Sequence, residues 1–474
     1  LGRWQINLVF IANLLAAATI RPTVAVAEMQ PASSRFERLH APLNPLSLAD
    51  LEQMALHSNP TLSQAAAEVS AAQGRAIQAG LYPNPTLGYT GEEIGAEGAA
   101  GQQGVFIDQL IVTGGKLGLS RSKYCHEVTQ MNWQAAGQQY RVLNGVRMRF
   151  YRVLGLEQLI KVRLNLTKIA QEAATTTEEL VNVGQANRPD LLQANSEFRR
   201  QRVALSAAEN RHRSAWADLA AFVGCPNLPP TSLSGSLEQD RQIFDWDSTL
   251  AHLLQASPEV QVARAEVARN QCGLAREQVE PIPNLRLRTA TQYNFATNDQ
   301  QASVQLGVSV PLWDKNQGNV RAAQSELARS QAEVRRIELS LQRRLAEVFN
   351  RYQTAINTVE EYRKHVLPQE GEAYKLYLES YRTRRAAWPQ VLVAQRTYVQ
   401  ANLEYLAALV EVRRLEVALA GLLLVDGLDE PPSPPGERRV EQSADRQLED
   451  QLDRSIRPHE GRGPNERFGS MLGE

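Results

Sequence analysis

NLRLRTATQYNFATNDQQASVQLGVSVPLWDKNQGN, residues 284–319, alternates polar and apolar side chains with a period of two. A period of two is typical of a β-strand, because successive side chains point to opposite faces. We therefore predict two strands, one before and one after a turn at residues 297–299. Each run has about the 9 to 11 residues that a tilted strand needs to cross a bilayer.

Each of these two strands presents one apolar face and one polar face. If the hairpin crosses a membrane, the apolar side chains face lipid and the polar ones face a water-filled lumen. The expected lipid-facing residues are Leu285, Leu287, Val304, Leu306 and Val308, and the expected lumen residues are Arg286, Arg288, Gln292 and Gln305. A hairpin on a soluble sheet shows the same alternation, so the rest of the chain must decide between the two.

Composition sets limits on the class of protein. The chain has 474 residues, with 51 Lys and Arg against 52 Asp and Glu and a formal net charge of -1. Without a basic excess, nothing indicates nucleic acid as a partner. The three cysteines, Cys125, Cys225 and Cys272, are too few and too scattered for a disulfide framework or a zinc site, and we expect them to be small core residues.

Residues 1–27 are typical of a secretory signal peptide. Arg3 precedes an apolar stretch at 6–20, and the small-residue motif AVA follows at 25–27. That stretch, about 15 residues long, is shorter than the roughly 20 of a spanning helix. We expect residues 28–46 to be an N-terminal extension of the exported protein. No long apolar run follows residue 27, so any membrane crossing there must use strands.

The chain carries the same pattern twice. Pro60, Pro83 and Pro85 recur as prolines 198 residues later, and RPDLLQA at 188–194 recurs as WPQVLVA 200 residues later. Such a long period indicates a duplicated half-protein rather than a solenoid. We expect a first repeat at 47–224, an inter-repeat loop or equatorial segment at 225–256, a second repeat at 257–424 and a disordered charged tail at 425–474.

Breakers and periodicity predict the same elements in each repeat. These are a helix of roughly 20 residues, a β-hairpin (86–112 and 284–311), a long helix and a shorter helix. No proline occurs from Lys116 to Val183, so one helix there would stretch roughly 100 Å at 1.5 Å per residue. Pro368 should kink or locally unwind the second long helix, since it lacks an amide proton.

Four period-two strands per chain are too few for a membrane barrel, which needs at least about eight. A closed barrel leaves no strand edge unpaired in lipid. Because one chain cannot close it, the membrane interpretation requires several copies of the chain. Three copies would supply twelve strands.

The order of helix, proline-bounded hairpin, long helix, tip and shorter helix, all duplicated, resembles the TolC-like outer-membrane efflux protein family. The tip carries the pattern VGxxxxPDLLxA at 183–194, and the resemblance covers residues 47–424. PLWDKNQGN at 311–319, GLYPNPTLGYTGEEIG at 80–95 and PIPN at 281–284 are similar to the heavy-metal-resistance branch of the CzcC and CusC type.

The resemblance implies a fold that is mainly α with a small β part. Duplicated long-helix coiled-coil hairpins would form an α-helical barrel, a tunnel in the periplasm. Four strands per protomer would contribute to a trimeric 12-stranded transmembrane β-barrel in the outer membrane. The implied partners are a periplasmic adaptor (membrane fusion) protein, an inner-membrane RND-type pump and outer membrane lipid. The implied function is a passive conduit for small solutes, heavy-metal cations among them.

The motifs of common enzymes are missing. TGGK at 113–116 lacks the first glycine of a phosphate-binding loop and has Leu117 where Ser or Thr belongs. Neither a GxSxG elbow nor an HExxH metal motif occurs. Cys125 and His126 are sequence neighbours, which point in different directions on a helix. We therefore expect no catalytic residue, no cofactor and no bound metal.

The two turns between helices form the expected periplasmic tip. In the resembling family the first turn carries a Val-Gly pair that meets the adaptor, and Val183, Gly184 and Gln185 match it. From its position alone, Gly184 is equally a helix C-cap. The aperture gate candidates are Arg188, Asp190, Arg382, Arg384 and Arg385. The acidic ring of the best-known members is absent, because Gln390 and Val393 occupy its positions.

Two alternatives remain at this stage. One is a soluble periplasmic coiled-coil scaffold, whose hairpins pack as a small sheet. The other is an outer-membrane channel for drug or type I protein export, which only the DKNQGN resemblance separates from a metal channel.

Overall fold

The computed structural model describes residues 45–95, 100–238, 242–383, 385–425 and 427–428. The helices and strands below belong to one unit that begins at Leu46. The expected signal peptide, nearly all of the N-terminal extension, most of the charged tail and Arg384 lie outside the described residues.

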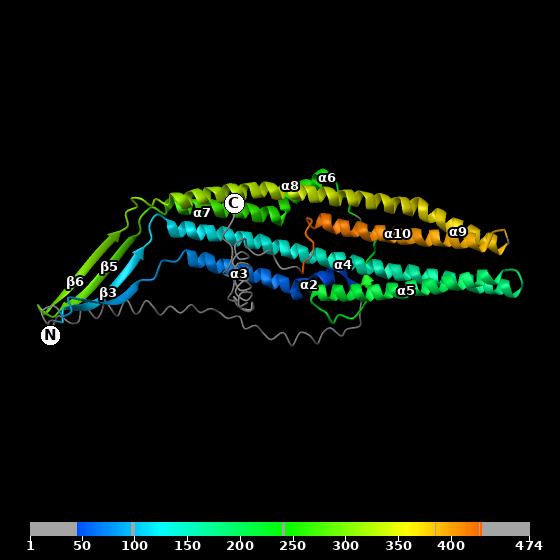
Figure 1. Ribbon diagram of the computed structural model, residues 1–474, viewed down its shortest axis with the longest axis horizontal. Helices are drawn as coiled ribbons and strands as arrows, with labels where there is room; N and C mark the ends of the chain where they lie inside the picture. Colours follow the sequence, from blue (N-terminus) through cyan, green and yellow to red (C-terminus); the bar gives the residue numbers. More distant parts are fainter. Residues whose placement is uncertain (1–44, 96–99, 239–241, 384, 426, 429–474) are drawn as a thin grey trace, which may run out of the picture. The chain divides into compact units, whose positions relative to one another are not determined.

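The elements follow the predicted order in both halves (Figure 1). The first half contains α2 (Leu48–Ser58), α3 (Pro60–Ala79), β2 (Thr86–Glu92), β3 (Gln102–Ile111), α4 (Lys116–Asn182) and α5 (Arg188–Val223). The second contains α6 (Trp246–Ala256), α7 (Pro258–Val279), β5 (Leu285–Asn294), β6 (Asp299–Val308), α8 (Gln317–Glu361), the π-helix η4 (Tyr362–Val366), α9 (Leu367–Arg382) and α10 (Trp388–Ala420). The protein is therefore mainly helical with a small β part, as predicted.

Each repeat begins with a short helix. Helix α2 begins with a capping box, in which the Ser47 hydroxyl accepts from the Asp50 amide and the Asp50 carboxylate accepts from the Ser47 amide. Its counterpart α6 begins 198 residues later, inside the segment that the sequence assigned to the inter-repeat loop. The second repeat thus begins near Trp246 rather than at residue 257. Strand β1 (Leu46–Ser47), next to α2, forms a two-residue parallel pair with β4 (Leu233–Ser234).

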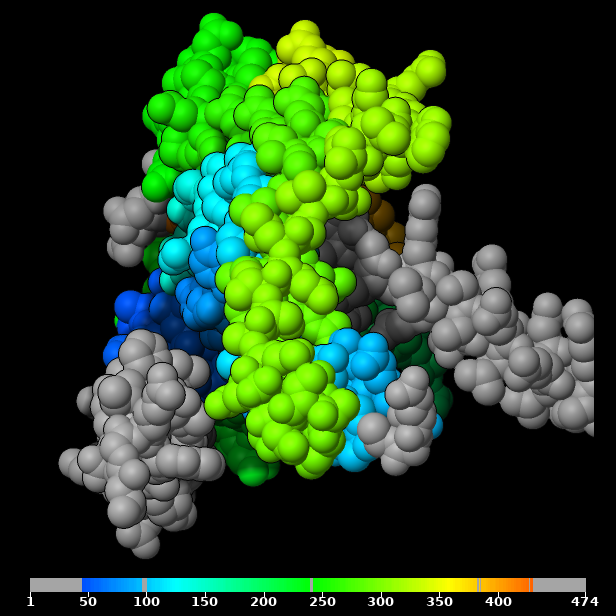
Figure 2. Space-filling model, turned by 90° about the vertical axis from the view of Figure 1, so that its left-hand side faces the viewer, coloured from blue at the N-terminus to red at the C-terminus, as the bar shows by residue number. Residues whose placement is uncertain are grey.

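Both hairpins form one four-stranded antiparallel sheet in the order β2-β3-β5-β6. Strand β3 of the first repeat pairs with β5 of the second, with Asp108 opposite Arg288. Strands β2 and β6 are the two edges, and every residue of β6 is exposed. Figure 2 looks onto this strand end, where the second hairpin, in yellow-green, lies foremost.

The long helices pack side by side. Helix α4 packs against α3, α5, α7 and α10, and α8 packs against α7 and α10 (Figure 1). The main core gathers residues of both repeats, among them Val142, Phe150, Phe222, Leu341 and Tyr352. Full burial of a large apolar side chain contributes about 1.5 to 3 kcal/mol. Among the described residues, no helix is both long and apolar enough to span a membrane.

Pro368 changes the helix in front of it, as predicted. The chain passes through one π turn, η4, in which the Leu367 amide donates to the Tyr362 carbonyl five residues back. A proline ring crowds the carbonyl four residues earlier, here that of Lys364, and widening the turn relieves this. The helix then continues as α9.

The prediction for the cysteines was partly wrong. Cys125 is exposed, and Cys225 and Cys272 are only partly buried; all three are free thiols. Helix α4 is so long that it has a solvent face along its length, and Cys125 lies on that face.

Candidate functional site

The sheet has one apolar face that lies open to solvent in the single chain. The register places Leu285 opposite Val308 and Leu287 opposite Leu306, with Val304 further along. Val304 is 71% exposed and Leu306 is 67% exposed, although both are large apolar side chains. Sequence reasoning missed the rest of this face, which comes from the first hairpin: Leu87, Tyr89, Val105 and Ile107 are all exposed. Together they form an apolar surface that spans the whole sheet.

The opposite face of the sheet is polar and cross-linked. Arg286 forms an ion pair with Asp108, with 3.4 Å between Nε and Oδ1. The Arg288 guanidinium lies 4.0 Å from the centroid of the Phe106 ring. Gln292 is buried and donates to the Thr90 hydroxyl at 3.4 Å. These contacts connect β5 to both strands of the first hairpin and fix which face each side chain occupies.

Gln305 joins this polar face from β6, because it lies opposite Arg288 in the register. The structure therefore brings the four expected lumen residues onto one face and the five expected lipid-facing residues onto the other.

A buried lysine marks the junction between strands and helices. Lys116, at the start of α4, is 3% exposed. Its ammonium donates to the Asn284 side chain at 3.2 Å and lies 3.8 Å from a Glu280 carboxylate oxygen. The Thr113 amide also donates to Asn284, at 3.2 Å. Lys116 and Thr113 belong to the first repeat, whereas Asn284 and Glu280 belong to the second. These contacts therefore join the two repeats.

The first tip ends α4 with a Schellman motif. Gly184 has φ +71°, its amide donates to the Val181 carbonyl at 3.0 Å, and the Gln185 amide donates to the Leu180 carbonyl at 2.7 Å. A left-handed residue at this position favours glycine. Gly184 is thus a helix C-cap, the alternative that the sequence left open. Val183 beside it is 65% exposed, so it is available to a partner.

The second tip repeats this backbone geometry. The Arg385 amide donates to the Ser380 carbonyl at 2.7 Å, 200 residues after the equivalent bond in the first tip. The side chain of Arg382 lies outside the described residues, as does the whole of Arg384. Arg385 is exposed, and so is Arg188 at the first tip.

An aromatic cluster that sequence reasoning missed supports the second tip. Trp388 is 2% exposed, and its ring centroid lies 5.2 Å from that of Tyr381. Burial raises the pKa of the Tyr381 phenol above its ordinary value, and the Asp190 carboxylate nearby adds to the rise. Asp190 is half-buried, so this gate candidate lies close to the second tip of its own chain. In the sequence, the one sign of this cluster was that two aromatic residues, Tyr381 and Trp388, stand on either side of the turn.

Within the part of the chain that the structure describes, an ion pair connects the two tip hairpins. Glu197 on α5 is buried, and Arg396 on α10 reaches it at 3.4 Å. Gln201 also donates to Glu197 at 2.9 Å, and Arg200 lies 3.7 Å away on the same helix. Sequence reasoning did not identify this pair, because its partners are 199 residues apart.

Across the described part of the chain, no group of three or more His, Cys, Asp or Glu side chains could hold a metal ion. The site is therefore a set of surfaces: an apolar and a polar sheet face at one end, and two helix tips at the other.

Comparison with known proteins gives a consistent result. The sequence model of the family described as outer membrane efflux protein matches residues 51–225 and again residues 249–423. The second match begins 198 residues after the first, the same offset as the proline pairs. The two matches together cover most of the chain.

Two curated proteins are similar in sequence. The cobalt-zinc-cadmium resistance protein CzcC of Cupriavidus metallidurans is 26% identical over 402 residues, which are 83% of this chain and 94% of that protein. The nickel-cobalt-cadmium resistance protein NccC of Alcaligenes xylosoxydans xylosoxydans is 27% identical over 333 residues, 67% of this chain and 72% of that protein. A crystal structure of CusC shares the fold, with a TM-score of 0.70 at 14% identity over 80% of this chain and 92% of that one.

Proposed function

This chain belongs to the outer membrane efflux protein family, and on that premise we propose that it is the outer-membrane channel of a tripartite system that exports heavy-metal cations. The observation that carries the cargo is the likeness to two curated proteins whose names state resistance to cobalt and cadmium, over up to 83% of this chain. Family membership sets aside the soluble scaffold. Export of drugs or proteins has no specific observation in its favour.

The β part of the proposal rests on the two faces of the sheet. An exposed apolar face across four strands has a large cost in water, about 25 cal/mol for each Å². In lipid this cost disappears, provided that the strand edges are paired. Three copies would join β6 of one chain to β2 of the next and form twelve strands. Arg286, Arg288, Gln292 and Gln305 would then line the lumen.

The helical part would continue this lumen through the periplasm. Helix α4 alone has 67 residues, or roughly 100 Å of helix. Since the channel is passive, an inner-membrane RND-type pump would supply the energy and a periplasmic adaptor would connect the two. We assign adaptor docking to Val183, Gly184 and Gln185, which lie on an exposed turn. Arg188, Asp190, Arg382, Arg384 and Arg385 would border the aperture.

Deletion of the gene in its own host tests the cargo. The deletion should raise intracellular cadmium, zinc or cobalt, measured by mass spectrometry of washed cells, and lower the metal concentration that stops growth. Expression of the full chain from a plasmid should reverse both effects. Unchanged metal content together with retention of an organic drug would refute metal export and move the cargo to drugs. Cation current through the purified protein in planar bilayers tests the channel separately.

A further inference from the structure

The charged side chains of the four-stranded sheet all lie on its polar face. The structure describes every residue of β2, β3, β5 and β6, and the register places their charged residues on the same face as Gln292 and Gln305: Glu92, Asp108, Arg286, Arg288 and Asp299. The apolar face of these strands carries no Asp, Glu, Lys or Arg. The charges of the sheet therefore all act on the space that the polar face borders.

These charges are sorted along the strands. At the helix end, where the strands join α4, α7 and α8, Arg286 and Arg288 lie with a single carboxylate, that of Asp108, so each chain has one net positive charge there. At the loop end, Glu92 and Asp299 lie in one row across the sheet, which contains no basic residue. This row is six residues beyond Arg288, or roughly 20 Å along the strand. The Debye length at physiological salt is about 8 Å, so ions respond to the two ends separately.

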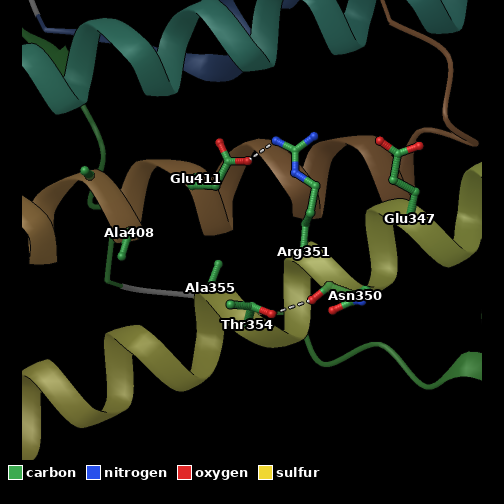
Figure 3. Close-up of a pocket in the computed structure, with 8 residues that line it drawn as sticks. Glu347, Asn350, Arg351, Thr354, Ala355, Ala408 and Glu411 are labelled. Carbon is green, nitrogen blue, oxygen red and sulfur yellow. Dashed lines mark hydrogen bonds and ion pairs between the residues drawn. The ribbon is translucent and has the colours of Figure 1, made fainter.

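Elsewhere in the chain, arginines are neutralised by carboxylates. Figure 3 shows Arg351 of α8 reaching across a groove of about 560 Å³ to Glu411 of α10, with which it forms an ion pair. Within the sheet, Arg286 pairs with Asp108 in the same way. Arg288 differs: Asp108 lies directly opposite it in the register, yet none of the described residues forms an ion pair with it. The net positive charge of the helix end therefore lies on Arg288.

The Phe106 ring holds this charge in place. The Arg288 guanidinium lies 4.0 Å from the ring centroid, where the face of an aromatic ring attracts a cation. The ring in turn lies over Gly88, since a Cβ added there would come within 2.5 Å of it. The ring has no net charge, so this contact orients the guanidinium without neutralising it.

We propose that Arg288 makes the helix end of the barrel lumen favour anions over free cations. This rests on the proposed function, because copies of the chain must close into a barrel before their polar faces border one lumen. Each copy then supplies one Arg288 at the same level, and a ring of basic side chains favours anions in a pore. The acidic row at the loop end favours cations at its own level. The two ends of the lumen thus prefer ions of opposite sign.

This arrangement limits the return of metal ions. Cations from outside the cell gather at the acidic loop end, but they meet the Arg288 ring before they reach the helical tunnel. The pump fixes the outward flux, whereas return through a passive channel is diffusive and falls with the local cation concentration. Arg288 therefore reduces leakage while the pump is idle. Anionic complexes of the metal pass this level more easily than the free cation.

Reaction of engineered cysteines with charged thiol reagents measures the potential at each level. The background replaces the three free thiols with serine: Cys125, Cys225 and Cys272. Ser303→Cys places a probe on the polar face, diagonally next to Arg288, and Gln301→Cys places one next to Asp299. Intact cells receive a cationic or an anionic methanethiosulfonate, and mass spectrometry of the purified chain gives the two rates.

The chain with native Arg288 should prefer the anionic reagent more strongly at residue 303 than at residue 301. A unit charge about 10 Å away changes the local concentration of a monovalent ion roughly twofold in water, and thus the ratio of the two rates roughly fourfold. With screening at about 0.01 M salt, Arg288→Gln should lower the anion preference at residue 303 roughly threefold. At about 1 M salt the Debye length is about 3 Å, so the difference should vanish.

Two further variants separate the charge of Arg288 from its structural role. Arg288→Lys keeps the charge and should keep the rate ratio. Arg286→Gln combined with Asp108→Asn removes one charge of each sign beside Arg288, so the ratio at residue 303 should change little. The comparison of residues 303 and 301 needs no charge variant, and it decides the matter even if Arg288→Gln does not reach the outer membrane.

Val304→Cys separates failure of this inference from failure of the proposed function. Val304 lies on the apolar face, so lipid should protect a cysteine there from both reagents. Rapid reaction at residue 304, or no reaction at residue 303, would refute the barrel and the inference with it. Protection at residue 304 with equal rate ratios at residues 303 and 301, or with a ratio that Arg288→Gln leaves unchanged, would overturn the role of Arg288 alone.

Discussion

The ion pair between Glu197 and Arg396 connects the two tip hairpins, so its loss should favour separation of the tips. Arg396 is 54% exposed at its side chain, and Glu197 is 9% exposed. Exposed pairs contribute about 0.2 to 1 kcal/mol, and removing one partner here leaves Glu197 with Gln201 and Arg200. We therefore expect Arg396→Ala to destabilise the closed state, in which the two tips lie together, by about 1 kcal/mol in each chain. This is roughly a fivefold shift of the equilibrium from the closed state toward the open state.

Single-channel recording in planar bilayers measures this shift. If three chains open together, the shift multiplies to roughly one hundredfold, and the mean open fraction of Arg396→Ala should rise clearly above that of the parent protein. Arg200→Ala is the matched control, since Arg200 also lies near Glu197 but on the same helix, α5. It removes one positive charge without disconnecting the hairpins. Equal currents from the two variants would refute the reasoning, as would an unchanged current from Arg396→Ala.

Three further predictions test other parts of the fold. Leu306→Arg should cost about 2 to 4 kcal/mol if its face meets lipid, whereas Gln305→Arg on the polar face should cost little; assembled protein in the outer membrane measures both, and equal yields would contradict the assignment. Phe222→Ala should lower the free energy of unfolding by about 3 to 5 kcal/mol, measured by denaturation in detergent, because Phe222 is fully buried. The Ser47 hydrogen bonds lower the pKa of Asp50, so their stabilisation is present above the ordinary carboxyl pKa and is lost as pH falls through the lowered value. Ser47→Ala should accordingly cost about 1 kcal/mol near pH 7 and less in strong acid, where the variant lacks only the bond that the hydroxyl accepts from the Asp50 amide; a cost that does not vary with pH would refute it.

Much of this fold could be predicted because its signals are local. The prolines at 60, 189, 258 and 389 fix the backbone dihedral of a first helical turn, and each lies at the start of a helix. Alternation over residues 285–308 fixes which side chains share a face, since a shift of one residue would reverse both faces. The sequence therefore predicted both hairpins and the long helix without any knowledge of their neighbours.

The contacts between helices could not be predicted in this way. The pair of Glu197 with Arg396 depends on how α5 and α10 lie relative to each other, and no local pattern fixes this. The same holds for Lys116, which a sequence reader expects on the surface but which is buried beside Asn284. The opposite error occurred at Cys125. Small apolar residues are usually buried, so we expected Cys125 in the core, but it is exposed on the solvent side of α4.

The π turn before Pro368 reconciles two offsets that otherwise conflict. Core positions of the long helices match at 199 residues, as Val153 and Tyr352 do, whereas the tips match at 200. The second long helix must therefore contain one more residue between Tyr352 and the tip. A π turn holds one extra residue in a single turn, and η4 is placed in that interval. The inserted residue thus bulges locally instead of rotating the rest of α9, so the backbone bond from Arg385 to Ser380 can repeat that from Gln185 to Leu180. Proline at 368 favours the wide turn at this place, which explains how a duplicated hairpin kept the geometry of its tip while its length changed.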